Sequence, residues 1–303
     1  MLLSCWENRL FICWVMDNQF VFDLNDYTCE FFALIRREWG FVEKLEHVSV
    51  TPQKTALVKA NGVTKIFRSR NGETVEALTP TTIDIAEGEF LSLIGPSGCG
   101  KSTFLRILAG LETPTAGSLE WRDGAPSSGS DIGFVFQEPV LLPWLTILDN
   151  VRFPLDVLGV GKQESTERSK AMLSLVGLAD FNKALPKELS GGMRQRAAIA
   201  RALVYKPRIV LMDEPFGALD LLTRDRLNDE LLGIHAETGS TIVFVTHSIE
   251  EAAYLSDRVA VMSARPGRIR TVHELGLNRK RSEALKDDPE FHRWLATLRK
   301  ELK

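Results

Sequence analysis

The stretch Gly95-Pro96-Ser97-Gly98-Cys99-Gly100-Lys101-Ser102 decides the fold. It matches the pattern G-x-x-x-x-G-K-[ST] and lies between the apolar segment Glu89–Ile94, which predicts a strand, and the helical run Thr103–Ala109. Glycines allow backbone N–H groups to turn inward around phosphate oxygens, and the N-terminal end of a helix favours negative charge. In this setting Lys101 is expected to reach the β- and γ-phosphates of a nucleotide, and the Ser102 hydroxyl to bind Mg²⁺.

The patterns on both sides of this loop predict an α/β fold. Upstream, Ala56–Phe67 and Thr74–Ile85 indicate strands. Downstream, Arg208–Met212 and Thr241–Thr246 are short apolar segments typical of buried strands, and helical sequence follows each of them. We therefore predict a P-loop NTPase core, which is a parallel sheet with crossover helices, together with an antiparallel β subdomain and an inserted helical subdomain.

The sequence pattern also divides the chain into parts. Residues 55–270 form the predicted nucleotide-binding unit, with a helical lobe at about 138–205 in which Ser165–Val176 shows a helical pattern. Residues 271–303 form a tail, for which we expect a charged stretch followed by an amphipathic helix at Pro289–Leu302. No internal repeat is evident.

Residues 1–54 differ from the rest because aromatic side chains crowd the segment without a clear periodicity. Two interpretations stay open. The segment is either an appended helical element or upstream sequence included through a wrong start codon. In both cases we expect the remainder of the chain to function without it.

Composition excludes several classes of protein. The net charge of −3 and the pI near 6.0 lack the basic character expected of a nucleic-acid-binding domain. The four cysteines show neither metal-ligand spacing nor the density of a disulfide scaffold, which favours a reducing, cytoplasmic environment: Cys5, Cys13, Cys29 and Cys99. No apolar run is long enough for a membrane span, and the N-terminal sequence does not resemble a secretory signal.

A pair of acids follows the second apolar strand segment. Ile209–Asp213 ends in a carboxylate, which is how the sheet of a phosphate site presents an acid to Mg²⁺ at the carboxyl ends of its strands. Asp213 is therefore the expected metal ligand. Glu214 comes next and is the candidate general base that would polarise the attacking water. Adjacent acids at a strand end are often only solvated or helix-capping groups, but the nearby phosphate loop favours the catalytic interpretation.

Between these two sites stands Leu189-Ser190-Gly191-Gly192-Met193-Arg194-Gln195-Arg196, and with it the sequence resembles the ABC ATPase family. The resemblance covers essentially Ala56–Gly267. It includes, in family order, the phosphate loop, Gln137, the signature Ser190–Met193, the strand that ends in Asp213, then Ala218-Leu219-Asp220, and His247. The family signature usually has glutamine where this chain has Met193, but Ser190 and Gly192, which carry the phosphate contacts in the family, are present.

The resemblance implies a role for each of these residues. Ser190, Gly191 and Gly192 would contact the γ-phosphate of ATP bound to a second subunit, because family members pack head to tail. Gln137 would contact Mg²⁺ and the attacking water, and His247 would contact the γ-phosphate and hold the water of Glu214. Phe67 resembles the aromatic residue that stacks on adenine, although a core residue would look the same. Together with the phosphate loop, the expected nucleotide-binding residues are Phe67, Gly95, Pro96, Ser97, Gly98, Cys99, Gly100, Lys101, Ser102, Thr103, Ser190, Gly191, Gly192 and Asp220.

The segments Gln137–Pro139, Leu141–Thr146 and Ser263–Ile269 resemble the importer branch that handles nitrate, sulfonates, taurine and related small compounds. The resemblance implies an ATPase with ATP and Mg²⁺ at its site. Its expected partners are a second ATP-binding subunit, two transmembrane permease subunits and, indirectly, a substrate-binding protein, on the cytoplasmic face of the inner membrane. Trp144 is either an anchor for the permease or a core residue of the helical lobe.

Two other classes are less consistent with the sequence. An ABC-type ATPase of DNA repair or translation would show coiled-coil insertions or two tandem cassettes. A P-loop kinase would lack the Ser190 signature and His247.

Overall fold

The computed structural model describes residues 2–6, 9–16, 19–22, 55–68, 71–126, 130–217, 219–276 and 283–302. The chain forms two compact units, Met1–Gln53 and Lys54–Lys303. In the first unit, three strands form an antiparallel sheet in sequence order: β1 (Leu2–Trp6), β2 (Arg9–Met16) and β3 (Gln19–Phe22). The helical interpretation is therefore wrong for the residues described there, since their many aromatic and aliphatic side chains suit strands. Expectations for residues 23–54 lie outside the described residues.

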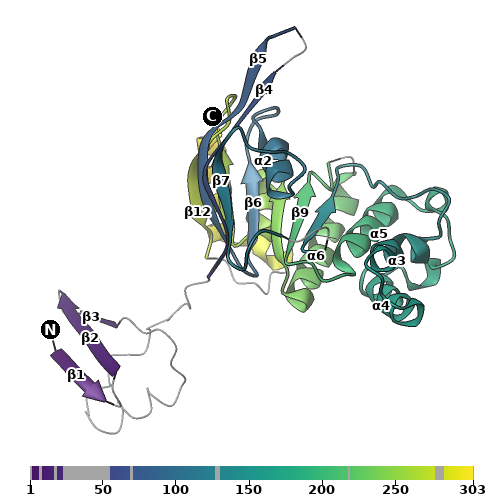
Figure 1. The fold of residues 1–303 in the computed structure, drawn as a ribbon, viewed down its shortest axis with the longest axis horizontal. Helices are drawn as coiled ribbons and strands as arrows, with labels where there is room; N and C mark the ends of the chain where they lie inside the picture. Colours follow the sequence, from purple (N-terminus) through teal and green to yellow (C-terminus); the bar gives the residue numbers. More distant parts are fainter. Residues whose placement is uncertain are drawn as a thin grey trace. The chain divides into compact units, whose positions relative to one another are not determined.

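The second unit is built on a six-stranded sheet with the order β12-β11-β6-β10-β9-β8 (Figure 1). Every neighbouring pair is parallel except β11 and β12, which run antiparallel. The predicted parallel core is therefore confirmed. The strands are β6 (Phe90–Ile94), β8 (Ile132–Val135), β9 (Ile209–Asp213), β10 (Thr241–Val245), β11 (Arg258–Met262) and β12 (Ile269–Glu274).

The three central strands are buried on both faces. In β10, Ile242 and Phe244 join one hydrophobic cluster, whereas Val243 and Val245 join another. Strands β6 and β9 divide their side chains between the same two clusters. Successive side chains of a strand point to opposite faces, so a strand covered on both sides must be apolar throughout. This explains why these segments are continuous apolar runs.

A second sheet, with the order β5-β4-β7, is antiparallel and forms the predicted β subdomain. Its strands are β4 (Ala56–Arg68), β5 (Thr74–Ala86) and β7 (Ala116–Trp121). One of the two hydrophobic clusters joins residues of this sheet to α2 and to the central strands. The phosphate loop between β6 and α2 is therefore supported by both sheets.

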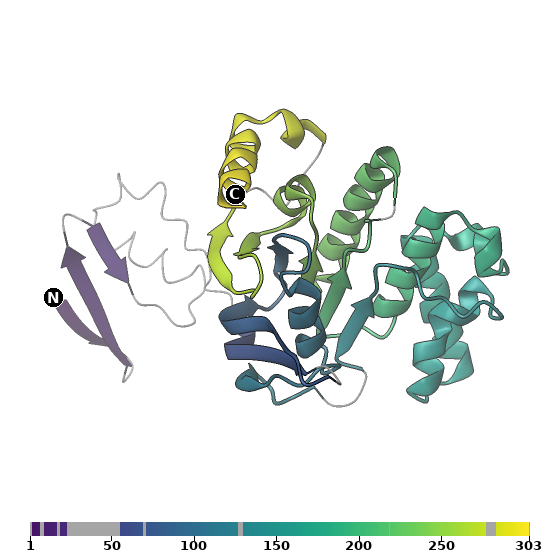
Figure 2. The same ribbon diagram turned by 90° about the horizontal axis from the view of Figure 1, so that it is seen from above.

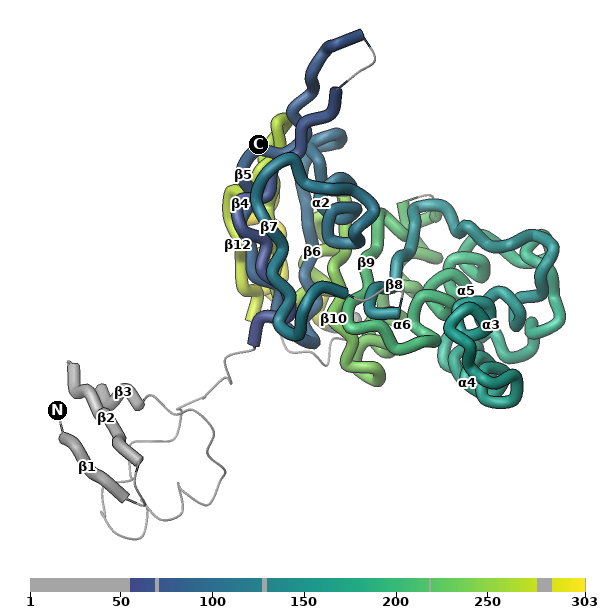
Figure 3. The backbone as a smooth tube through the Cα atoms, viewed as in Figure 1, coloured from purple at the N-terminus to yellow at the C-terminus, as the bar shows by residue number. Residues whose placement is uncertain are grey.

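The helices α3, α4 and α5 gather on the side of β8 away from the antiparallel sheet, as Figures 2 and 3 show. This group is the predicted helical subdomain. Among the described residues, no helix has the length and apolar character that crossing a lipid bilayer requires. The helices are α2 (Lys101–Leu108), α3 (Ile147–Val157), α4 (Lys162–Leu175), α5 (Gly191–Leu203), α6 (Leu221–Thr238), α7 (Ile249–Leu255) and α8 (Pro289–Glu301), with short 3₁₀ turns at Ala179–Phe181, Pro186–Glu188 and Glu283–Asp287.

Strand β12 (Ile269–Glu274) lies at the start of the predicted tail, where the sequence pattern indicated no strand. In this strand Ile269, Thr271 and His273 are half-buried, and the side chains between them are exposed. β12 stands at the edge of the sheet, where charged residues are common because they discourage pairing with another chain. The sequence pattern also missed β7 and β11.

We predict that Phe244→Ala destabilises the second unit by about 3–5 kcal/mol, because it removes a fully buried ring from the core. Phe244 packs against Phe90 and Phe216, with ring centroids 5.8 Å away in both cases. Denaturant unfolding measures the loss. Val157→Ala, at a side chain that is 70% exposed, should change stability by no more than about 0.5 kcal/mol, and an equal effect of the two variants would contradict the assignment of this core.

Candidate active site

A pocket of about 280 Å³ lies where the phosphate loop, β9 and the antiparallel sheet meet. Its lining joins residues that are far apart in the sequence, and most of them were expected at a nucleotide site. They are Phe67, Ala77, Ser97, Gly98, Gly100, Lys101, Ser102, Thr103, Glu214 and Arg265.

The phosphate loop depends on Gly100 at the start of α2. This residue has a φ of 107°, and a Cβ atom there would lie 2.7 Å from the carbonyl oxygen of Ala77. Only glycine is compatible with both conditions. Lys101, only 4% exposed, follows directly, and its Nζ donates hydrogen bonds to the carbonyl oxygens of Gly95 at 2.8 Å and Pro96 at 3.1 Å. The ammonium group is thus held inside the loop that is expected to surround phosphates.

Ser102 connects the loop to β9. Its hydroxyl donates a 2.7 Å hydrogen bond to Oδ1 of Asp213, the last residue of β9. Burial raises the pKa of Asp213, and the Ser102 hydrogen bond and the positive charge of Arg106 oppose this shift. A nearby cation would stabilise the charged form of a carboxylate in such surroundings.

Glu214 lies at the edge of the pocket in a strained conformation. Its φ of 45° is in the left-handed region, which costs energy for a residue with a side chain. The backbone N–H of Glu214 donates to Val245 at 3.0 Å, and its Oε2 is 3.3 Å from Nδ1 of His247. A Cβ atom on Gly217 would lie 3.5 Å from Nε2 of Gln137 and 3.7 Å from Oε2 of Glu214. Three side chains expected to be catalytic therefore gather around one point.

The loop that carries His247 is held by groups that sequence reasoning missed. Thr246 donates a hydrogen bond to Glu251, a buried carboxyl whose pKa is raised by burial. Arg224 joins α7 to the loop before α6, because its Nε is 3.4 Å from Glu251 and its guanidinium also donates to the carbonyl oxygen of Leu219 at 3.0 Å. The pattern offered one signal, an acid shortly after His247, but an acid at the start of a helix is too common to indicate this contact.

The signature residues lie at the start of α5. Ser190 is the N-cap of this helix and accepts a hydrogen bond from Met193 N–H at 3.3 Å. Cβ atoms on Gly191 and Gly192 would approach Leu219 at 3.4 Å and Thr223 at 3.0 Å, so this end of α5 packs close to the start of α6. The described residues that line the pocket do not include these three signature residues.

Of the remaining predicted residues, some line the pocket and others do not. Phe67 is 38% exposed and lines the pocket, so the core interpretation of this side chain is wrong. Asp220 caps α6 by accepting a hydrogen bond from Thr223 N–H at 3.0 Å, which lowers its pKa, and it does not line the pocket. Gly95, Pro96 and Cys99 do not line it either, and the thiol of Cys99 packs in the core at 1% exposure.

The oxygen atoms beside the phosphate loop suit a divalent cation that binds together with a nucleotide. The described residues contain no group of three or more His, Cys, Asp or Glu side chains able to hold a metal ion. Mg²⁺, however, is commonly held by one or two protein oxygens together with substrate phosphates and water. Asp213, Ser102 and Gln137 offer a carboxylate, a hydroxyl and an amide, so this set suits Mg²⁺ bound together with a nucleotide.

Comparison with known proteins agrees with this geometry. The family model described as ABC transporter matches residues 78–217. An uncharacterised ABC transporter ATP-binding protein of Methanocaldococcus jannaschii is 45% identical over 262 residues, which are 86% of this chain and 97% of the relative. A taurine import ATP-binding protein of Rhizobium johnstonii is 44% identical, with 82% and 95% covered, and a nitrate import ATP-binding protein of Synechocystis is 42% identical, with 76% and 89% covered.

Solved structures include a dimeric ATP-binding cassette in a post-hydrolysis state with bound ADP and Pi. It superposes with a TM-score of 0.63 at 35% identity, over 73% of this chain and all of that one. The phosphate loop, the paired acids after β9 and the signature at the start of α5 thus occur together in a chain that matches ATP-binding cassettes over most of its length. The chain belongs to the ABC transporter family, as an ATP-binding and ATP-hydrolysing subunit.

Proposed function

We propose that this chain drives the import of a small solute, such as nitrate, a sulfonate, taurine or a similar compound, by binding and hydrolysing ATP as one half of a head-to-tail dimer. The observation that carries the proposal is the contact of Glu214 with His247 at 3.3 Å beside the Ser102–Asp213 pair. This contact supports the roles proposed for Glu214 as the base and for His247 as its positioning group. The named importers among the relatives support the solute class.

In the proposed reaction Lys101 and the N-terminal end of α2 bind the phosphates, and Phe67 stacks on the adenine. Ser102, Asp213 and Gln137 hold Mg²⁺, which supplies positive charge to neutralise the phosphate oxygens. Glu214 accepts a proton from the attacking water, and His247 fixes the position of the Glu214 carboxylate. The left-handed backbone at Glu214 aims the carboxylate at the pocket, which is a reason for the strain to persist.

The signature is proposed to act on the nucleotide of the second subunit. Ser190 begins a helix of 13 residues, whose N-terminal end favours an anion. Because Ser190 is outside the pocket of its own chain, this end is available to a nucleotide held by a partner. The similar cassette that was solved as a dimer supports the presence of a second subunit.

The permease is proposed to dock in a groove of the helical subdomain. This groove has a volume of about 500 Å³ and is lined by Leu142, Trp144, Leu145, Asp149, Arg152, Phe153 and Asp156. Trp144 is 72% exposed, so its alternative interpretation as a core residue is wrong. An exposed tryptophan beside a groove is the kind of side chain that anchors a partner.

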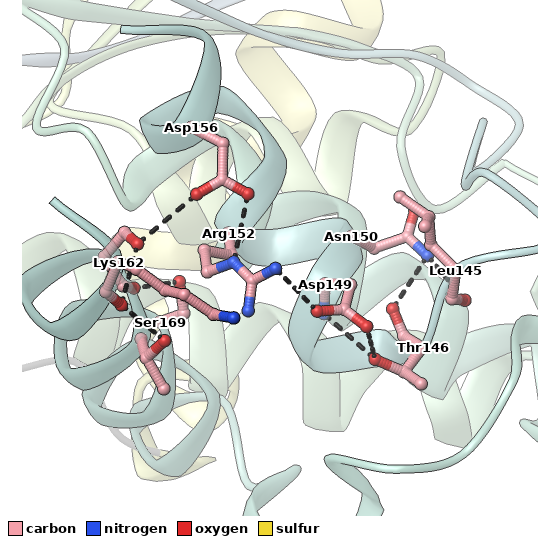
Figure 4. Close-up of polar contacts among 10 residues, drawn as sticks. Leu145, Thr146, Asp149, Asn150, Arg152, Asp156, Lys162 and Ser169 are labelled. Carbon is pink, nitrogen blue, oxygen red and sulfur yellow. Dashed lines mark hydrogen bonds and ion pairs between the residues drawn. The ribbon is translucent and has the colours of Figure 1, made fainter. Parts of the chain in front are cut away.

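Hydrogen bonds and ion pairs fix the shape of this groove. Asn150 is fully buried and accepts a hydrogen bond from Leu142 N–H at 2.8 Å, while its amide donates to carbonyl oxygens of the same loop at 3.0–3.1 Å. Figure 4 shows Arg152 between Asp149 and Asp156, and it pairs with both at 3.0 Å. These contacts hold the loop that presents Trp144 in one conformation. We propose that the docking site lies at the cytoplasmic face of the inner membrane.

We predict that Glu214→Gln lowers the rate of ATP hydrolysis by about 10²–10⁴-fold and leaves nucleotide affinity nearly unchanged, because only the base is lost. Phosphate release and equilibrium nucleotide binding measure the two effects. Glu250→Gln, at an exposed acid near His247, is the matched control and should hydrolyse normally. Near-normal turnover by Glu214→Gln would remove Glu214 from the role of base.

Trp144→Ala should reduce the stimulation of ATPase activity by the permease more than the basal activity, because the anchor lies outside the nucleotide pocket. The measurement compares hydrolysis by the isolated chain with hydrolysis by the assembled transporter and its loaded binding protein. Phe181→Ala changes an exposed aromatic residue of the same subdomain that does not line the groove, and it should keep the stimulation. Equal loss of basal and stimulated activity would contradict docking at Trp144.

The action of Ser190 across the dimer is tested with Lys101→Ala and Ser190→Arg placed in heterodimers that also carry Glu214→Gln. Each nucleotide site of the proposed dimer combines the phosphate loop of one subunit with the signature of the other. With both lesions in one subunit, both sites are therefore damaged, and no ATP should be occluded. With the lesions in opposite subunits, both fall in one site and the other should occlude one ATP. The reverse pattern would show that each signature serves its own chain.

A further inference from the structure

The segment Ser263–Arg268, which joins β11 to β12, carries an arginine into the nucleotide pocket. Arg265 is exposed and lines the pocket together with Phe67, Lys101 and Thr103. We propose that Arg265 is a further nucleotide-binding residue, whose guanidinium contacts the base and sugar end of ATP rather than its γ-phosphate. The inference rests on the proposed nucleotide site and adds a residue to it.

The turn is closed by its own hydrogen bonds. The Ser263 hydroxyl accepts from Arg268 N–H at 3.1 Å and donates to the carbonyl oxygen of Pro266 at 3.2 Å. The Ser263 N–H also donates to the carbonyl oxygen of Arg268 at 2.9 Å. These three bonds enclose Arg265, so its backbone is held in place while its side chain is exposed to solvent.

Gly267 fastens the turn to the walls of the pocket. Its N–H donates to Ala77 at 3.1 Å, and its carbonyl oxygen accepts from Thr79 N–H at 2.9 Å, so the turn is hydrogen-bonded to β5. A Cβ atom on Gly267 would lie 1.7 Å from the carbonyl oxygen of Cys99 in the phosphate loop. This close approach requires glycine, and it means that the turn rests directly on the loop that holds the phosphates.

The strand register brings the turn that carries Arg265 close to Phe67. Phe67 pairs with Val75, and Ala77, which lines the pocket and binds Gly267, is two residues further along β5 on the same face. The turn is therefore attached close to the aromatic side chain that is proposed to stack on adenine. The γ-phosphate end is instead marked by Glu214 and His247.

The chemistry of arginine suits this position. A guanidinium is planar, always charged and carries five donors, so it can stack on a π-face and donate to sugar or α-phosphate oxygens. Lys101, the other cation of the pocket, is buried and bonded to loop carbonyls. Arg265 thus adds a solvent-exposed positive charge to the lining of the pocket.

A contact far from the γ-phosphate is the same before and during hydrolysis. Interactions that bind ground state and transition state equally change KM and leave kcat unaltered. ATP and ADP share the base, sugar and α-phosphate, so both should lose affinity by the same factor. A contact to the γ-phosphate would weaken ATP alone.

The test compares Arg265→Ala and Arg265→Lys with Arg268→Ala in the full-length chain. Arg268 is the matched control because it is an exposed arginine of the same turn that does not line the pocket. Calorimetric titration with ATP and with ADP should show that Arg265→Ala raises both dissociation constants about 5–10-fold, as expected for an exposed guanidinium contact. Arg265→Lys should recover part of the loss, and KM should rise with kcat unchanged.

Several outcomes would overturn the inference: unchanged affinities for both nucleotides, a loss for ATP but not ADP, a fall in kcat at constant KM, or an equal loss in Arg268→Ala. Failure of the proposed function itself would look different, since the unmodified chain would then bind neither nucleotide.

Discussion

The hydroxyl of Ser102 donates a hydrogen bond to Asp213 at 2.7 Å, and this contact joins residues 111 positions apart in the chain. It forms because β6 and β9 lie on either side of β10 and all three run parallel, so their carboxyl ends meet at one edge. The other features of the site are arranged around this pair. Ser102 is the last residue of the phosphate loop, and Asp213 is followed by Glu214, which contacts His247.

Polar contacts among partly or fully buried side chains hold the loops around the site. Arg224 bonds to Leu219 just before α6 and pairs with Glu251 in α7, which in turn accepts from Thr246 beside His247. A buried carboxyl is costly unless it is paired and hydrogen-bonded, so this arrangement has few alternatives. It connects the loop before α6, which packs against the signature helix, with the loop that positions the base.

The sequence predicted those parts of the molecule that local pattern determines. The central strands were recognisable because burial on two faces requires a continuous apolar run, and the phosphate loop because its backbone needs glycines at fixed positions. β12 was missed because an edge strand is only half buried and resembles a charged loop. Arg265 and Arg224 were missed because their roles arise from contacts with distant segments, β5 and α7, which no spacing along the chain records.

We infer that Ser102 and Asp213 act as one unit at the end of the nucleotide that Mg²⁺ would contact. It is tested most directly by measuring how much Mg²⁺ strengthens ATP binding in the unmodified chain, in Ser102→Ala, in Asp213→Asn and in the double variant. Each single change should remove most of the Mg²⁺ dependence, and binding of metal-free ATP should persist. The double variant should lose no more of the Mg²⁺ effect than either single variant. Strictly additive losses, or an undiminished Mg²⁺ effect in Asp213→Asn, would contradict it.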